Sequence, residues 1–251
     1  MSRKRLEYNE LLQLKKFDTP TIFNGWSAMT DHDITKGYVN LEETRDFMPE
    51  MGPMIGYAVT VVIEPSNPEH FENSYETWSK YAEFVASIPF PGIVIIQDLD
   101  KPNVIGSFWH EMNSELHKVF RCIGTITDGA ITDLDGMKKI SFKAIARRLS
   151  VGRAYVTPIR WDCEVEVFGC SIKPGQLIHA DKHGFLAIPE EDEKNLLEAV
   201  EFMNEIRYNS DEKLLKVVKD VKGKNNEEIL TAIDKANAYT SKAIRDKYGG
   251  K

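Results

Sequence analysis

The sequence lacks several features that would indicate a function directly. Its 251 residues have a formal net charge of −7 at pH 7, which opposes general binding to nucleic acid. No apolar run approaches the length of a membrane span, and we expect no membrane association. Residues 1–9 are basic and then polar rather than apolar, so we expect no secretion signal and place the protein in the cytoplasm.

Cysteine is also scarce, and the common nucleotide-binding loops are absent. The three cysteines, Cys122, Cys163 and Cys170, have no Cys-x-x-Cys spacing, so we expect small buried thiols in a reducing compartment. No Gly-x-Gly-x-x-Gly follows the first expected strand, and there is no Walker loop. No serine lies in a nucleophile elbow either, which leaves little support for nucleotide-binding folds or serine hydrolases.

What the sequence does contain is an alternation of helical and strand-like segments, with 42% hydrophobic residues, enough for one good core. The order predicts an α/β sandwich with a mixed sheet in residues 1–190, followed by a helical C-terminal extension in residues 191–251. The run at 92–97 is apolar throughout, which is typical of a strand covered on both faces. Periodicity and turn chemistry predict helices at 6–17, 19–29, 73–87, 106–119 and 190–246, and strands at 54–63, 92–97, 123–126, 143–147, 153–157, 163–168, 177–180 and 185–188.

Two acids stand at expected junctions of strands and helices. Glu111 lies close to the start of the helix expected after strand 92–97. Asp133, 22 positions after Glu111, follows strand 123–126. The carboxyl ends of strands in an open α/β sheet form the edge at which ligands collect, so both acids could serve one divalent cation. Isolated acids of this kind are, however, more often solvated or capping groups. A second group, His179, Asp181 and His183, is expected to be a hydrogen-bonded turn rather than a metal site.

Several blocks in this order resemble the RraA-like family, which includes the 4-hydroxy-4-methyl-2-oxoglutarate aldolases. The most specific block, residues 124–133, resembles the pattern Gly-x-x-x-Asp-Gly-x-x-Arg-Asp. The resemblance covers roughly residues 15–192, and the residues after these have no counterpart in the short family pattern. The other blocks are Thr19–Asn24, Met54–Val61 (Gly-x-Ala-x-Thr-Val in the family), Trp109–Glu111, and Lys173–Asp181 through Gly184 and Pro189.

The resemblance implies an RraA-like fold of the swivelling β/β/α type and metal-dependent carbon–carbon chemistry. In the aldolases, the acid equivalent to Asp133 holds Mg²⁺ or Mn²⁺, and the acid at Glu111 orients metal waters or moves a proton. The pyruvyl part of a 2-oxo acid chelates the cation through its keto and carboxylate oxygens, and the cation stabilises the enolate. Substrate-binding positions carried over by the resemblance are His110, Met112, Asn113 and Thr132, with backbone amides near residues 111–113 holding the carboxylate. A homotrimer or hexamer is also implied.

Two positions depart from the family pattern. Thr132 stands where the family has the arginine that clamps pyruvate, and His110 stands where glycine is usual. Losing a charged hydrogen bond costs about 1.5–3 kcal/mol, so another cation, such as Arg148, Arg160 or His110, could hold the carboxylate instead. Two hypotheses remain: a divalent-metal-dependent lyase performing retro-aldol cleavage or oxaloacetate-type decarboxylation, and a non-catalytic regulator that binds a protein such as a ribonuclease.

Overall fold

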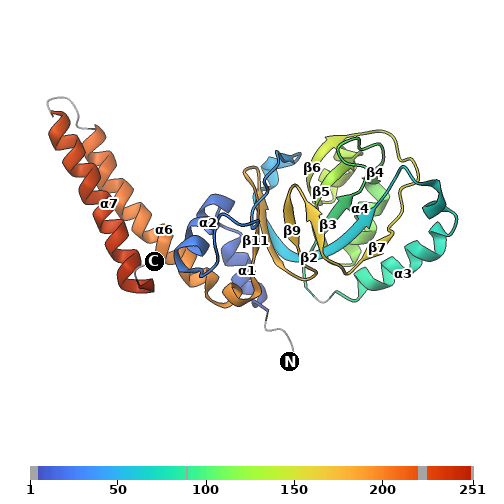
Figure 1. Cartoon of the computed structure of the whole chain (residues 1–251), viewed down its shortest axis with the longest axis horizontal. Helices are drawn as coiled ribbons and strands as arrows, with labels where there is room; N and C mark the ends of the chain where they lie inside the picture. Colours follow the sequence, from blue (N-terminus) through green and yellow to red (C-terminus); the bar gives the residue numbers. More distant parts are fainter. Residues whose placement is uncertain (1–4, 89, 220–224, 250–251) are drawn as a thin grey trace. The chain divides into compact units, whose positions relative to one another are not determined.

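A computed structural model describes residues 5–88, 90–219 and 225–249 of the chain (Figure 1). Contacts divide the chain into two compact units. The first comprises the residues up to Thr19 together with Asp33–Glu193, and the second comprises Pro20–His32 together with the residues from Lys194 onward. None of the helices in the described ranges has the length and apolar character needed to cross a bilayer.

The first unit is built on a nine-stranded mixed sheet, as the sequence predicts. Its central strands are parallel neighbours, β2 (Met54–Ile63), β3 (Gly92–Asp98), β5 (Cys122–Ile131) and β6 (Lys143–Leu149). The strand order is β1-β6-β5-β3-β2-β10-β11; β4 (Ser107–Trp109) pairs with β5 in parallel, and β7 (Arg160–Trp161) pairs with β2 antiparallel. The remaining strands are β1 (Arg45–Asp46), β10 (Leu177–Asp181) and β11 (Gly184–Ile188), all antiparallel to their neighbours.

Alternate residues of the central strands point to opposite faces, and each face has its own core. Val94 and Ile96 of β3 join the core on the side of the helices α3 (Ser74–Ala86), α4 (Glu111–Val119) and α5 (Leu134–Lys139). Ile93 and Ile95 join the other core, beneath the hairpin of β8 (Val165–Val167) and β9 (Cys170–Ile172). The continuous apolar run is thus covered on both faces, and the layers are hairpin, sheet and helices, which confirms the predicted fold class.

Three local predictions are wrong. The helix expected at 106–119 begins only at Glu111, because buried Ser107–Trp109 pair with β5 as β4. The strand expected at 123–126 continues to Ile131 as β5, with a shift in its register to β6 between Thr127 and Ala130. The strand expected at 153–157 is a stretch of turns without regular secondary structure. Shorter elements complete this unit: α1 (Tyr8–Leu14) and the 3₁₀ helices η1 (Pro49–Met51) and η2 (Pro68–Phe71).

The second unit is helical, and the predicted helical C-terminal extension is confirmed. It contains most of α2 (Thr19–Met29), most of α6 (Glu190–Lys219) and all of α7 (Asn226–Tyr248). The Ser210 hydroxyl of α6 donates to the Ala236 carbonyl of α7 at 3.3 Å. The Lys247 ammonium pairs with Glu198 at 2.8 Å, so α6 and α7 form a helical hairpin. The boundary expected after residue 190 stays a prediction.

The close approach between α2 and α6 at Gly25 allows a test of how these two helices pack. A Cβ added at Gly25 would lie 2.6 Å from the Cα of Val200 and 2.7 Å from its amide nitrogen, both backbone atoms. We therefore expect Gly25→Ala to lower the free energy of unfolding of this unit by about 1–3 kcal/mol, the usual cost of overpacking. Urea unfolding followed by far-ultraviolet circular dichroism, to which the long helices of this unit contribute strongly, measures the change. Asn24→Ala is the control on the same helix, and equal stability of the two variants would contradict the prediction.

Candidate functional site

The two predicted acids lie next to each other at the carboxyl edge of the sheet. Strands β4 and β5 are parallel neighbours that end at Trp109 and Ile131, so the residues after them emerge side by side. The Thr132 amide donates to the Trp109 carbonyl at 3.1 Å. The Glu111 amide points to the Asp133 carboxylate, with 3.4 Å between the nitrogen and Oδ2. Residues separated by 22 positions thus meet because two parallel strands end together.

Both side chains at this position are exposed to solvent. Asp133 has a left-handed backbone (φ 55°) and precedes the first turn of α5. The Glu111 side chain lies against Gly136 of that helix, where an added Cβ would be 2.8 Å from the Cβ and Cγ of Glu111. The Thr132 hydroxyl is 3.4 Å from Asp133 Oδ1. The predicted pair therefore forms one exposed acidic site.

The other predicted substrate-binding residues surround the start of α4. His110 is half-buried and extended just before the helix, and Met112 is exposed in its first turn. Asn113 is buried, and its side-chain amide donates to the Phe108 carbonyl at 2.9 Å. Its side chain is therefore engaged within the protein, so Asn113 would meet a ligand through its backbone amide. The roles of His110, Met112, Asn113 and Thr132 stay predictions.

A cation that sequence reasoning missed acts on this site. Burial lowers the pKa of His110, the positive charge of Arg153 lowers it further, and the Asp133 carboxylate raises it. Arg153 belongs to a loop held against β4, where the Ser107 amide donates to the Gly152 carbonyl at 2.8 Å. The sequence did not indicate Arg153 as a site residue because residues 153–157 were expected to form a strand. Of the cations named from the sequence, Arg148 donates to the adjacent Leu149 carbonyl at 3.1 Å, and Arg160 lines a separate pocket described below.

The donor set fits a hydrated divalent cation rather than a cage of protein ligands. No cluster of three or more His, Cys, Asp or Glu able to hold a metal occurs within the described ranges. Magnesium commonly keeps several waters and takes one or two carboxylates. Both hydrogen-bond contacts of the Asp133 carboxylate are 3.4 Å long, so its oxygens stay accessible for such an ion. Asp133 would be the direct ligand, with Glu111 reached through water.

The remaining clusters from the sequence have structural roles. The Asp181 carboxylate accepts the Thr19 amide and the His183 amide, each at 2.8 Å. The Thr19 hydroxyl contacts Nδ1 of buried His179 at 2.9 Å. The expected hydrogen-bonded turn is therefore correct. Cys122 and Cys170 are buried free thiols, and burial raises the pKa of each to about 12, which makes them poor nucleophiles.

The chain belongs to the RraA-like (Aldolase/RraA) family, whose pattern matches residues 19–187. One relative is a putative 4-hydroxy-4-methyl-2-oxoglutarate aldolase of Halalkalibacterium halodurans, 27% identical over 168 residues, which are 66% of this chain and 74% of that protein. Protein DlpA of Legionella pneumophila is 19% identical over 160 residues. That match covers 63% of this chain but only 24% of DlpA.

Solved structures have the same fold. An uncharacterized protein from Pseudomonas syringae superposes with a TM-score of 0.67 at 14% identity, covering 94% of this chain and 97% of the other. Streptomyces coelicolor RraAS2, an unusual member of the RNase ES inhibitor RraA family, superposes with a TM-score of 0.61 at 16% identity, covering 78% of this chain and 92% of the other. At these identities the likeness concerns the fold.

Proposed function

We propose that the protein is a divalent-metal-dependent lyase acting on a 2-oxo acid or a related hydroxy acid. The observation that carries the proposal is the contact between the Glu111 amide and the Asp133 carboxylate at the carboxyl edge of β4 and β5. Membership of a family that includes aldolases, and the similarity to a putative 4-hydroxy-4-methyl-2-oxoglutarate aldolase, support the same class. The reaction would be retro-aldol cleavage or oxaloacetate-type decarboxylation.

Each residue has a distinct proposed role. Asp133 would hold Mg²⁺ or Mn²⁺, which supplies Lewis-acid stabilisation of the enolate when bound. Glu111, exposed beside it, is placed to orient water or move a proton. The Met112 and Asn113 amides, which follow the Glu111 amide at the start of α4, and the helix dipole favour a substrate carboxylate. Arg153, whose charge already acts on His110, would supply part of the positive charge that Thr132 lacks.

Pyruvate release is the direct test. Purified protein with Mg²⁺ or Mn²⁺ is incubated with oxaloacetate or related aldols, and pyruvate is followed with a coupled enzyme. We expect metal-dependent turnover that EDTA abolishes. Absence of turnover with these substrates, together with a melting temperature that neither metal changes, would contradict the lyase.

A substitution at position 132 is expected to increase the proposed aldolase activity. Thr132→Arg restores the donor fork that the family pattern places beside the final aspartate, and a charged hydrogen bond contributes about 1.5–3 kcal/mol. We therefore expect a higher kcat/KM for aldol substrates by about 10-fold or more. Thr132→Gln, which adds length without charge, is the matched control. An equal effect of the two substitutions would show that the charge at this position is unimportant.

The alternative is a regulator without chemistry, which binds a protein such as a ribonuclease. The observation that favours it is Thr132 in place of the family's arginine, and RraAS2 shows that the fold also occurs among proteins described as RNase ES inhibitors. Inhibition of a ribonuclease by the purified protein, unchanged in Asp133→Asn, would favour this function over the lyase. For either function we propose a homotrimer or a hexamer, which light scattering distinguishes from a monomer.

A further inference from the structure

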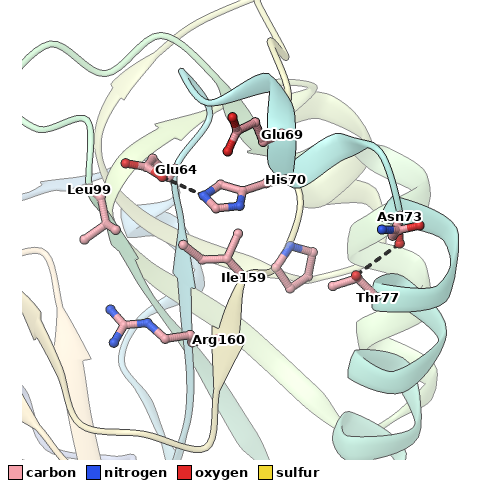
Figure 2. Close-up of a pocket in the computed structure, with 9 residues that line it drawn as sticks. Glu64, Glu69, His70, Asn73, Thr77, Leu99, Ile159 and Arg160 are labelled. Atoms are coloured by element: carbon pink, nitrogen blue, oxygen red, sulfur yellow. Dashed lines mark hydrogen bonds and ion pairs between the residues drawn. The ribbon is translucent and has the colours of Figure 1, made fainter.

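A second site lies at the carboxyl ends of β2 and β3. A cavity of about 530 Å³ opens there, between the residues that follow these strands, η2, the start of α3 and the segment leading into β7. Figure 2 shows the side chains that line it. None of Glu111, Thr132 and Asp133 is among them. The carboxyl ends of parallel strands are the usual ligand position in α/β sheets, so the place itself suits binding.

One wall of this cavity carries a histidine oriented by a carboxylate. His70 Nε2 is 2.6 Å from Glu64 Oε2, and the Asn67 side-chain amide contacts the same oxygen at 3.3 Å. These hydrogen bonds lower the pKa of the Glu64 carboxyl. With Nε2 donating to Glu64, Nδ1 of the neutral ring is a hydrogen-bond acceptor. Within the described ranges, Nδ1 has no hydrogen bond to another residue.

The cavity also contains a cation and an apolar surface. Arg160 extends from β7, exposed, with no ion pair or hydrogen bond from its side chain to any other residue that the structure describes. Figure 2 shows Ile159 between Arg160 and His70, with Leu99 to one side of them near Glu64. The Glu64 carboxylate is hydrogen-bonded to His70 and Asn67, and neither Glu64 nor Glu69, the other acid of the lining, pairs with Arg160 among the residues that the structure describes. An unpaired guanidinium is the usual partner of a carboxylate, which it binds with two parallel hydrogen bonds.

From these groups we propose that the cavity binds a small hydroxycarboxylic acid. Arg160 pairs with the carboxylate, and His70 Nδ1 accepts the hydrogen bond of the hydroxyl. Leu99 and Ile159 contact the carbon skeleton of the acid. An acceptor nitrogen selects a hydroxyl over a hydrogen or a keto oxygen at the same carbon, since only the hydroxyl donates. This site is independent of the proposed lyase centre.

Matched pairs of acids test this site. Isothermal titration at pH 8 compares lactate with propionate and pyruvate, and malate with succinate. We expect the hydroxy acids to bind about 2- to 10-fold more tightly than their partners, the effect of one hydrogen bond. Arg160→Gln should weaken binding of lactate and malate by at least about 10-fold. His70→Phe should abolish the preference for the hydroxyl while a weaker carboxylate binding persists.

Three controls separate this site from folding effects and from the lyase. Arg207→Gln removes an exposed arginine of α6 and should leave binding unchanged. The titrations contain EDTA, so the metal-dependent lyase centre is not loaded, and failure of the lyase proposal and failure of this one give different results. Thermal melts establish that each variant is folded. Equal binding of lactate and propionate, or unchanged binding in a folded Arg160→Gln variant, would overturn the proposal.

Discussion

Replacing Asp133 with Asn is expected to reduce metal-dependent turnover by at least about 100-fold, because a bound cation supplies several kcal/mol of charge stabilisation and each 1.4 kcal/mol is a factor of ten. The carboxylate is exposed and its contacts with Glu111 and Thr132 are long, so the substitution should leave the fold intact. Pyruvate release measures the loss. Melting with and without Mn²⁺ measures binding, since a ligand of the folded state raises the melting temperature.

The control for Asp133→Asn is Asp135→Asn, which removes an exposed acid from the first turn of the same helix. It should retain activity and the metal-dependent shift in melting. Glu111→Gln should lose turnover but keep part of the melting shift, because Glu111 is proposed to reach the cation only through water. Full activity in both Asp133→Asn and Glu111→Gln would place the chemistry elsewhere in the protein.

The meeting of Glu111 and Asp133 was expected from strands 92–97 and 123–126 ending together, whereas in the structure Glu111 follows β4, which ends beside β5. Apolar periodicity located β2 and β3 almost to the residue, and the resemblance supplied the acids that follow the next strands. Strand β4 was not anticipated: three residues of a helical-looking segment form it, and pairing with β5 decides their conformation over local propensity. Helix α5 was also missed, since its six residues are too short for a helical period.

The cavity with His70 and Arg160 was not anticipated for a different reason. Its two polar ends are 90 positions apart, and they face one cavity only because β7 pairs antiparallel with β2. A two-residue strand such as Arg160–Trp161 has no sequence pattern of its own. The sequence therefore offered Arg160 only as a substitute for the arginine missing at position 132, whereas the structure places it in a separate cavity with His70. Sequence periodicity predicts which long strands form. Which side chains a short strand such as β7 brings together depends on how that strand pairs in the folded protein.

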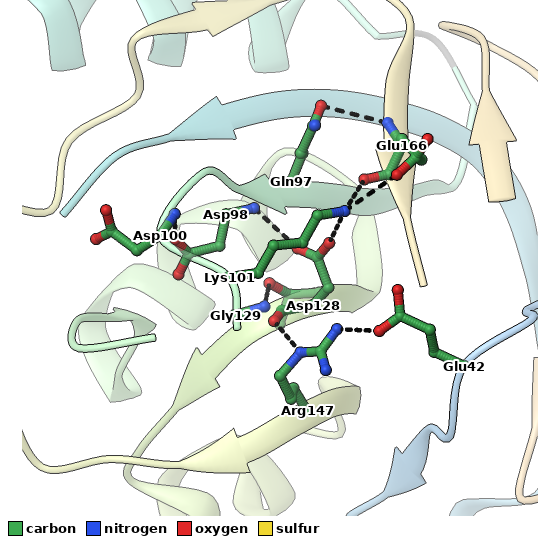
Figure 3. A network of polar contacts seen from close by, with 10 residues as sticks. Glu42, Gln97, Asp98, Asp100, Lys101, Asp128, Gly129, Arg147 and Glu166 are labelled. Carbon is green, nitrogen blue, oxygen red and sulfur yellow. Dashed lines mark hydrogen bonds and ion pairs between the residues drawn. The ribbon is translucent and has the colours of Figure 1, made fainter. Parts of the chain in front are cut away.

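The second large expected effect is a dependence of stability on pH, caused by a buried acid, Asp98, at the end of β3. Asp98 is fully buried at the end of β3, and one of its oxygens, Oδ2, has no hydrogen-bond partner among the residues that the structure describes. Figure 3 shows it beside Asp128, whose carboxylate accepts the Asp98 amide at 2.8 Å and pairs with Lys101 at 3.0 Å. Burial raises the pKa of Asp98 to about 7, and the charges of Asp100 and Asp128 raise it while that of Arg147 lowers it.

The raised pKa of Asp98 makes stability depend on pH. Between its ordinary value of 3.8 and about 7, the folded protein holds a proton that the unfolded chain has released. The contribution of Asp98 to stability is therefore complete below pH 4 and is lost as pH rises to 7. Asp98→Asn stays neutral and keeps the acceptor for the Asp100 amide, which Asp98 Oδ1 binds at 2.9 Å. The stability of this variant relative to the natural protein should rise by a few kcal/mol from pH 4 to pH 8, since one pKa unit corresponds to about 1.4 kcal/mol.

Urea unfolding at a series of pH values measures this difference, with Asp135→Asn as the exposed control that should track the natural protein. Other groups that titrate between pH 4 and 8 cancel in the comparison, because only position 98 differs between the chains. A constant difference between Asp98→Asn and the natural protein across the series would mean that Asp98 is ionised throughout. In that case Lys101 and Arg147, which both contact Asp128, would have to stabilise two buried carboxylates at once. Lys101→Met should then destabilise the protein more strongly at pH 8 than at pH 4, since it would leave both charges with Arg147 alone.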